Sequence, residues 1–177
     1  MTRDRSGERR LIITADDFGA APEVNEAVAI GHSQGVLTAA SLMVGAPAAA
    51  EAVAIAKSLP SLRVGLHLVL VQGRPVMPPD EIPALVDAEG RFRSDMARAG
   101  AAIFFRPDAR AQLAAEIAAQ FAAFAATGLP LDHANAHKHF HLHPTIGALM
   151  ARIGRRFGLK AARAPVEPRG VLRRVEP

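Results

Sequence analysis

The apolar positions of this chain form short runs that alternate with stretches of helical periodicity. Charged residues, Pro or Gly bound each run, a pattern typical of buried strands. Pro22 suits the first turn of one expected helix, and Gly35 suits its left-handed cap. The expected strands cover 11–14, 37–44 and 62–70, and the expected helices cover 22–35 and 47–58. This order predicts a parallel sheet with crossover helices, an α/β fold.

Residues 71–108 interrupt that rhythm because they are rich in Pro, Gly and charge. We expect a long loop with little regular structure there, and such loops inside compact domains are often functional. A strong helical pattern follows over 108–128, with apolar residues on one face. That face is formed by Leu113, Ile117, Phe121 and Phe124. The rest predicts a strand over 131–136, a helix over 144–158 and a fifth strand over 160–165.

Composition narrows the chemistry. The chain has 177 residues, enough for one domain with a sizeable core, and no cysteine, so any metal must be held by His, Asp or Glu. No apolar run approaches the roughly 18 residues that a membrane span needs. The charged start, MTRDRSGERR, does not resemble a signal peptide, so we expect a cytoplasmic protein.

Positive charge is concentrated near the C-terminus. Residues 152–177 hold eight basic and two acidic residues, so the rest of the chain carries a net charge of −2. Phe157 is the one aromatic residue there that could stack on a base, and we expect no nucleic-acid partner. We therefore predict one domain over 1–165 that includes the long loop 71–108, followed by a basic, flexible end over 166–177.

Polar, chemically active side chains follow the expected strands. Asp16 and Asp17 come after the first strand, and His67 lies near the end of the third. The fourth leads into HANAHKHFHLHP, with histidines at 133, 137, 139, 141 and 143. Because the carboxyl ends of parallel strands gather functional groups, these side chains are expected to converge at one edge.

The spacing of the histidine run adds detail. All five histidines and Asn135 have odd numbers, so in extended chain they would share one face. The even positions are mostly packable. The pattern therefore predicts a polar or metal-lined face in which one or two histidines are ligands and others are acid–base or supporting groups.

Each feature alone has an ordinary explanation. Asp16 could cap a helix, His67 could be a hydrogen-bonded core histidine, and the histidine run could be a surface metal scavenger. His32, on the first expected helix, is expected to be solvated. Placed together at successive strand ends, the first three features favour a functional site over these separate explanations.

An Asp, His, His set is typical of a three-ligand metal site with open positions for water and substrate. A metal there polarises a carbonyl and lowers the pKa of bound water. The second aspartate can then act as general base, and a spare histidine can protonate the leaving group. This combination predicts hydrolysis of an amide or ester.

Three motifs together resemble the YdjC/ChbG-like carbohydrate deacetylases. They read TADDFG over 14–19, GLHL over 65–68 and AHKHFHLHP over 136–144, in the family's order. DAEGRF over 87–92 also fits a recurrent stretch of the family's long loop. The resemblance covers roughly residues 11–165 and is strongest to the branch associated with hopanoid biosynthesis.

The resemblance implies a (β/α) barrel related to the polysaccharide deacetylases, a divalent metal (Mg²⁺ or Zn²⁺), and removal of N-acetyl groups from amino sugars such as chito-oligosaccharides. An N-acetylated sugar, including a lipid-linked glycoside, is the implied partner. Carried over by motif, the metal ligands are Asp17, His67 and His137. Asp16 is the candidate base, although the two aspartates could exchange roles. His139 and His141 are expected near the substrate, one of them as acid.

Members of that family are usually longer than this chain, for which about five strands are expected. We therefore expect the N-terminal part of a barrel, either a fragment or a protein that a partner completes, with a homodimer as one option. Two other readings stay open: a metal-dependent phosphoesterase or sugar isomerase on a similar barrel, and a non-catalytic metal-binding remnant.

Overall fold

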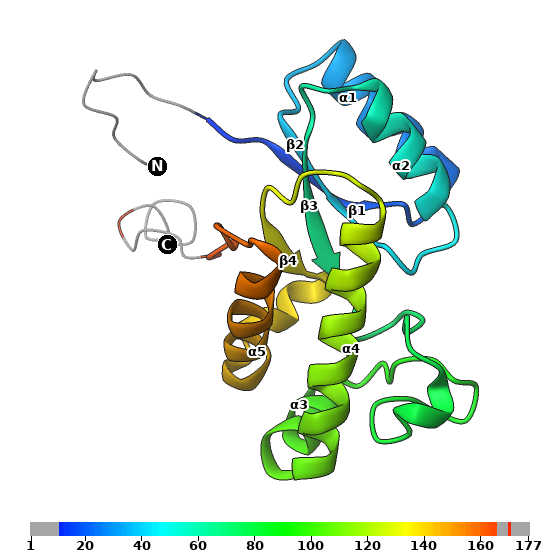
Figure 1. Cartoon of the computed structure of the whole chain (residues 1–177), viewed down its shortest axis with the longest axis vertical. Helices are drawn as coiled ribbons and strands as arrows, with labels where there is room; N and C mark the ends of the chain where they lie inside the picture. The colour runs from blue at the N-terminus through cyan, green and yellow to red at the C-terminus, as the bar shows by residue number, and fades with distance from the viewer. Residues whose placement is uncertain (1–10, 166–169, 171–177) are drawn as a thin grey trace.

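The structure is a computed structural model, and it describes residues 11–165 and 170. Four strands form one parallel sheet in the order β1-β2-β3-β4. They are β1 (Thr14–Phe18), β2 (Ala39–Leu42), β3 (Arg63–Leu68) and β4 (Ala134–Ala136). Helices α1 (Pro22–Ser33), α2 (Ala49–Ser58), α4 (Pro107–Ala126) and α5 (Pro144–Gly154) alternate with or follow the strands, as Figure 1 shows. The predicted α/β class is confirmed.

The two faces of the sheet differ in chemistry because side chains alternate along each strand. On one face, Leu42, Leu66 and Ala136 are buried in the apolar core. On the other face, the buried side chains include the polar groups of Ser41, His67 and Asn135. Buried polar side chains on this second face, called the inner face below, contribute little to an apolar core, so this face is the candidate location of a functional site.

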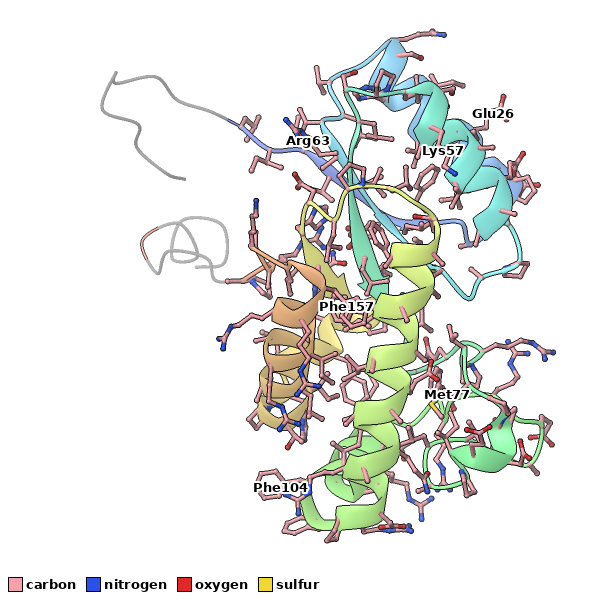
Figure 2. All side chains as sticks on the ribbon, viewed as in Figure 1. Glu26, Lys57, Arg63, Met77, Phe104 and Phe157 are labelled. Atoms are coloured by element: carbon pink, nitrogen blue, oxygen red, sulfur yellow. The ribbon has the colours of Figure 1, made fainter. Side chains whose placement is uncertain are left out.

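Helix α4 confirms the strongest helical pattern of the sequence. Leu113, Ile117, Phe121 and Phe124 are all buried in the core that includes the apolar face of the sheet. Phe157, in the short 3-10 helix η3 (Arg155–Phe157), stacks on Phe121 with ring centroids 5.6 Å apart. Figure 2 shows Phe157 where α4 and α5 meet.

The first strand does not lie where its apolar run predicts. Leu11 and Ile12 are 77% and 76% exposed, and β1 begins only at Thr14. Pairing with the segment that leads into β2 starts at Ile13, whose carbonyl accepts from the amides of Thr38 and Ala39. The pairing geometry, not the apolar run, sets this strand, and it places both aspartates inside β1 rather than after it.

The predicted loop 71–108 contains more regular structure than expected. It includes a short 3-10 helix, η1 (Pro79–Glu81), and a ten-residue helix, α3 (Met96–Phe105). The side chain of Asp95 caps α3 by accepting from the amide of Arg98. Ile82, Val86 and Phe92 bury their side chains in the core, so this segment is a folded part of the domain.

Two local predictions need correction or reduction. Gly35 is not left-handed. Position 35 favours glycine for a different reason, since a Cβ there would lie 2.7 Å from the carbonyl oxygen of Gly31. The predicted fifth strand is reduced to one parallel bridge between Ala134 and Ala162.

Closure of the sheet into a barrel stays a prediction. So does the flexible end over 166–177, which except for residue 170 lies outside the described residues. Within 11–165 and 170, no helix is long and apolar enough to cross a membrane.

Candidate metal centre

Asp16 and Asp17 are brought to the same site by a break in β1. Neighbouring residues of a regular strand point to opposite faces, but Asp17 has a left-handed backbone with φ of 60°. The register between β1 and β2 shifts between Ala15 and Phe18, where this residue sits. Its carbonyl accepts from the amide of Ala20, which closes the turn toward α1. A left-handed aspartate is tolerated more easily than most residues, yet it costs about 1 kcal/mol.

Three side chains from three strand ends meet at this break. Oδ1 of Asp17 lies 3.0 Å from Nδ1 of His137 and 3.1 Å from Nε2 of His67. One ligand atom from each residue lies within 4.8 Å of the others. This is the one such group of three or more His, Cys, Asp or Glu residues in the part of the chain that the structure describes. The three residues expected as metal ligands are therefore together in space.

His67 has the burial and the hydrogen-bond pattern of a metal-binding histidine. It is 2% exposed, and its Nε2 is buried without a hydrogen-bond partner. Its Nδ1 lies 2.6 Å from Oδ1 of Asn135. Burial lowers the pKa of His67, which keeps the ring neutral and able to donate a lone pair. The buried Nε2 of His67 lies against the carboxylate of Asp17. An imidazole nitrogen next to a carboxylate fits the ligand set of Zn²⁺ and related divalent ions.

Asp16 is held by different partners. Nη1 of Arg163 donates to its Oδ2, Nη2 of Arg163 donates to its Oδ1 at 2.9 Å, and Nδ2 of Asn135 donates to Oδ1 at 2.9 Å. Burial raises the pKa of Asp16. The hydrogen bonds from Arg163 and Asn135 and the nearby positive charge outweigh that effect and lower the pKa to about 2. Asp16 is therefore an oriented, ionised carboxylate beside the candidate metal ligands.

The histidine run does not form the extended polar face that its odd numbering predicts. After β4 the chain enters 3-10 turns, η2 (His137–Leu142), in which Lys138 and His139 have left-handed φ of 55° and 53°. The alternation therefore ends at Ala136. The histidines after Ala136 therefore do not share one face, and their surroundings differ.

The remaining histidines divide between supporting and exposed positions. His133 lies 3.0 Å from Oγ of Ser41, on the inner face of the sheet. Nε2 of buried His141 donates to the carbonyl of Arg163, and burial lowers the pKa of His141. The ring of His143 packs edge-on against Phe104 and Phe140. His139 is exposed on the η2 turn.

His32 is not the freely solvated residue that its position on α1 suggests. Its Nδ1 lies 2.8 Å from the carbonyl oxygen of Leu37, and its Nε2 lies 2.8 Å from Oγ of Ser61. It is partly buried and ties α1 to the segments before β2 and β3.

A pocket of about 290 Å³ opens beside Asp17 and His137. Loops that follow β1, β2 and β3 form its walls, and Arg74 and Arg91 line it together with apolar atoms. The full lining is Asp17, Ala20, Met43, Gly45, Ala46, Pro47, Val69, Gln72, Gly73, Arg74, Arg91 and His137. A cavity of this kind next to convergent polar groups is the usual form of a small-molecule site.

Two buried residues of α4 hold the wall that follows β3. The carboxylate of Glu116 accepts from the amides of Val76 and Met77, and Gln120 bonds both the amide and the carbonyl of Val69. Figure 2 shows Met77 beside α4. These bonds fix the loop against the helix although the loop has no strand or α-helix between Val69 and Met77.

Sequence reasoning missed Arg163, which it counted only as part of a basic C-terminal stretch. The signal available was an arginine between alanines in a predicted strand, an unusual place for a charge without a partner. Asn135 was noticed for its odd number, but its link between His67 and Asp16 depends on strand order and could not be read from spacing.

Comparison with known proteins agrees with this geometry. The profile of the YdjC-like proteins matches residues 10–176. The chain belongs to the YdjC-like family. The match covers the strand ends that carry both aspartates, His67 and His137.

The curated proteins similar to this chain include carbohydrate deacetylases. One, from Brevibacillus brevis, is 38% identical over 148 residues, 84% of this chain and 56% of the relative. Another, from Geobacillus stearothermophilus, is 35% identical over 161 residues, 90% of this chain and 60% of the relative. This chain therefore spans somewhat more than half the length of the curated relatives it matches.

A solved structure shares the fold. It is a protein from Enterococcus faecalis V583, provisionally assigned to cellobiose-phosphate cleavage, with a TM-score of 0.76 and 29% sequence identity. The similarity covers 89% of this chain and 60% of that chain. The α/β arrangement with four parallel strands is thus shared with a solved structure.

Proposed function

We propose that this chain carries the catalytic part of a metal-dependent hydrolase that removes N-acetyl groups from an amino sugar or chito-oligosaccharide. The observation that carries the proposal is the cluster of Asp17, His67 and His137 beside an ionised Asp16, at the mouth of a pocket. The carbohydrate deacetylases among its relatives supply the reaction class.

Asp17, His67 and His137 are the proposed holders of a divalent cation, Mg²⁺ or Zn²⁺. When bound there, such an ion polarises an amide carbonyl and lowers the pKa of water. The protein contributes a preset geometry, since β1, β3 and the residue directly after β4 each deliver one ligand and the ligand atoms already lie within 4.8 Å of one another.

Asp16 is the proposed general base. Arg163 and Asn135 fix its orientation. Oδ1 accepts from both residues and Oδ2 accepts from Arg163, so the remaining lone pair of Oδ2 can accept a proton from the attacking water. A carboxylate with a pKa near 2 holds a proton weakly, so Asp16 releases the proton to solvent and returns to its ionised form. The reaction then needs a group that can deliver a proton on the amine side.

His139 is the better of the two histidines proposed as acid. It is exposed on the η2 turn, two residues beyond the proposed ligand His137. His141 is buried and donates its Nε2 hydrogen to the backbone of Arg163. We propose that His139 protonates the leaving amine, whereas His141 holds the segment that carries Arg163.

The pocket beside the cluster is the proposed sugar site. Its lining combines apolar atoms of Met43 and Pro47 with the guanidinium groups of Arg74 and Arg91, so a polar ring with apolar faces fits its chemistry. The proposed substrates include a lipid-linked glycoside of the hopanoid type, for which the resemblance to the hopanoid branch is the support.

Acetate release tests the proposal. The full chain is incubated with a panel of N-acetylated amino sugars, chito-oligosaccharides and one acetylated lipid glycoside, with added Zn²⁺ or Mg²⁺ and with chelator. We expect metal-dependent acetate release from at least one substrate class, and its loss in Asp17→Asn. Phosphate release from a phosphoester panel without acetate release would favour a phosphoesterase, and metal binding without any turnover would favour the non-catalytic reading.

A further inference from the structure

Asn135 stands between the candidate metal ligands and Asp16. It is fully buried on β4, and its register partner on β3 is His67. Its Oδ1 lies 2.6 Å from Nδ1 of His67, and its Nδ2 lies 2.9 Å from Oδ1 of Asp16. One side chain therefore contacts both halves of the site.

The neighbours of Asn135 determine which end of its amide faces which partner. Asp16 receives both terminal nitrogens of Arg163, so it is an ionised carboxylate that only accepts hydrogen bonds. The amide nitrogen of Asn135 must face it, since the opposite orientation would place two oxygen acceptors in contact. The amide oxygen is then left to face His67.

This orientation decides where the hydrogen on the His67 ring lies. An amide oxygen can only accept, so Nδ1 of His67 carries the hydrogen and Nε2 carries the free lone pair. That Nε2 is buried without a hydrogen-bond partner and lies 3.1 Å from Oδ1 of Asp17. Two acceptors face each other where a cation would fit.

We propose that Asn135 is a positioning residue that selects the His67 tautomer able to bind metal and ties this ligand to Asp16. The inference rests on the proposed metal site. A continuous series of hydrogen bonds runs from Arg163 through Asp16 and Asn135 to His67. Asn135 is 0% exposed and His67 is 2% exposed, so water would not readily replace the Asn135 amide if a substitution removed it.

Two substitutions separate the accepting and donating roles of this amide. Asn135→Leu has a similar volume but neither accepts from His67 nor donates to Asp16. Asn135→Asp keeps an oxygen for Nδ1 of His67, but it replaces the donor to Asp16 with a second carboxylate oxygen. A matched control is Ser41→Ala, which removes another, partly buried hydrogen bond from the same face of the sheet, to His133, and Ser41 contacts none of the proposed ligands.

The affinity of the full chain for Zn²⁺, measured by competition with a chromophoric chelator, tests the proposal. Loss of a group that orients a histidine ligand costs about 10–100-fold in metal affinity. We expect a loss of that size in Asn135→Leu, a change of less than about threefold in Asn135→Asp, and wild-type affinity in Ser41→Ala. Wild-type affinity in Asn135→Leu, or equal large losses in Asn135→Asp and Ser41→Ala, would overturn the proposal.

Nitrogen NMR of the metal-free protein provides a second readout, independent of metal and of turnover. The shifts of His67 should report hydrogen on Nδ1 in wild type and in Asn135→Asp, and on Nε2 or on both nitrogens in turn in Asn135→Leu. If Asn135→Leu does not fold, wild type and Asn135→Asp decide, and hydrogen on Nε2 in wild type overturns the inference. A wild-type chain with hydrogen on Nδ1 that binds no Zn²⁺ would sink the proposed function and leave the tautomer assignment standing.

Discussion

Oδ1 of Asp17 lies 3.0 Å from Nδ1 of His137, although 120 positions separate the two residues in the chain. β1 and β4 are the two outer strands of the parallel sheet and would lie about 14 Å apart if it were flat, so the contact shows that the sheet curves and brings their carboxyl ends together. Oδ1 of Asp17 also approaches Nε2 of His67, so a single carboxylate oxygen is the centre of the cluster. This relationship makes the metal response the first property to measure.

We expect Zn²⁺ to raise the melting temperature of the full chain, because a ligand that binds only the folded state stabilises it. At a free concentration of about 100 times Kd, the gain is about 2.7 kcal/mol. His67→Ala should abolish the rise, and His139→Ala should keep it, because His139 is exposed and outside the cluster. Differential scanning fluorimetry with and without Zn²⁺ checks this. An unchanged rise in His67→Ala would remove His67 from the site.

The two aspartates should differ when each is changed to asparagine. Asp17→Asn is expected to lose metal and activity together, because it removes the negative charge of the carboxylate at the centre of the cluster. Asp16→Asn is expected to keep metal and to lose about 10²–10⁴ in rate, the usual contribution of a general base. Metal content and acetate release, measured on both variants, separate the roles. If Asp16→Asn loses its metal and Asp17→Asn retains it, the assignment is reversed.

Glu116 predicts a pH effect on stability away from the metal centre. Burial raises the pKa of this carboxyl above its ordinary value of 4.5, and the bonds from Val76, Met77 and Gln120 oppose that rise only in part. A group whose folded pKa is raised binds its proton more tightly when folded, so it favours folding at low pH. Its contribution falls as pH rises through the folded pKa.

Comparison with Glu116→Gln isolates this effect, because glutamine does not titrate. We expect wild type to lose stability relative to Glu116→Gln as pH rises from 4.5 toward neutrality. Urea unfolding of both proteins at several pH values measures the difference. A difference that stays constant with pH would show that the carboxyl is not perturbed.

Gly65 should tolerate no side chain. A Cβ there would lie 2.5 Å from the carbonyl oxygen of His133 and 2.6 Å from its ring, so β3 and β4 would have to move apart. Overpacking of this kind costs about 1–3 kcal/mol. Gly31→Ala is the control, because its Cβ would lie 3.6 Å from Leu37 within α1, where alanine favours the helix by up to about 1 kcal/mol. Thermal unfolding of both variants should shift in opposite directions.

The sequence predicted the parallel sheet and the gathering of both aspartates, His67 and the histidine run at one edge, because both follow from the order of elements. The carboxyl ends of parallel strands lie at the same edge, so residues at the ends of apolar runs could be assigned to it without coordinates. The same logic predicted the buried face of α4, whose apolar residues repeat at helical spacing. The choice of Asp17, His67 and His137 as the ligands came from the family resemblance.

Departures from regular backbone could not be predicted from residue patterns. Asp17 and His139 adopt left-handed φ, and neither is a glycine that would signal it. Those two residues decide that both aspartates share a site and that the histidine run is not extended. Helix α3 was missed because Pro and Gly around it suggested a loop, whereas its cap, Asp95, is a signal that the surrounding composition obscured.

The ion pair between Arg163 and Asp16 joins residues 147 positions apart. A ribosome adds about 5–20 residues each second, so Asp16 is made roughly 7–30 seconds before its partner. Late in that interval the nascent chain contains β1 to β4, but Asp16 still lacks the cation that orients it. The candidate site is therefore completed after all four strands have been synthesised, and a pause before residue 163 would leave a full set of strands with an unfinished site.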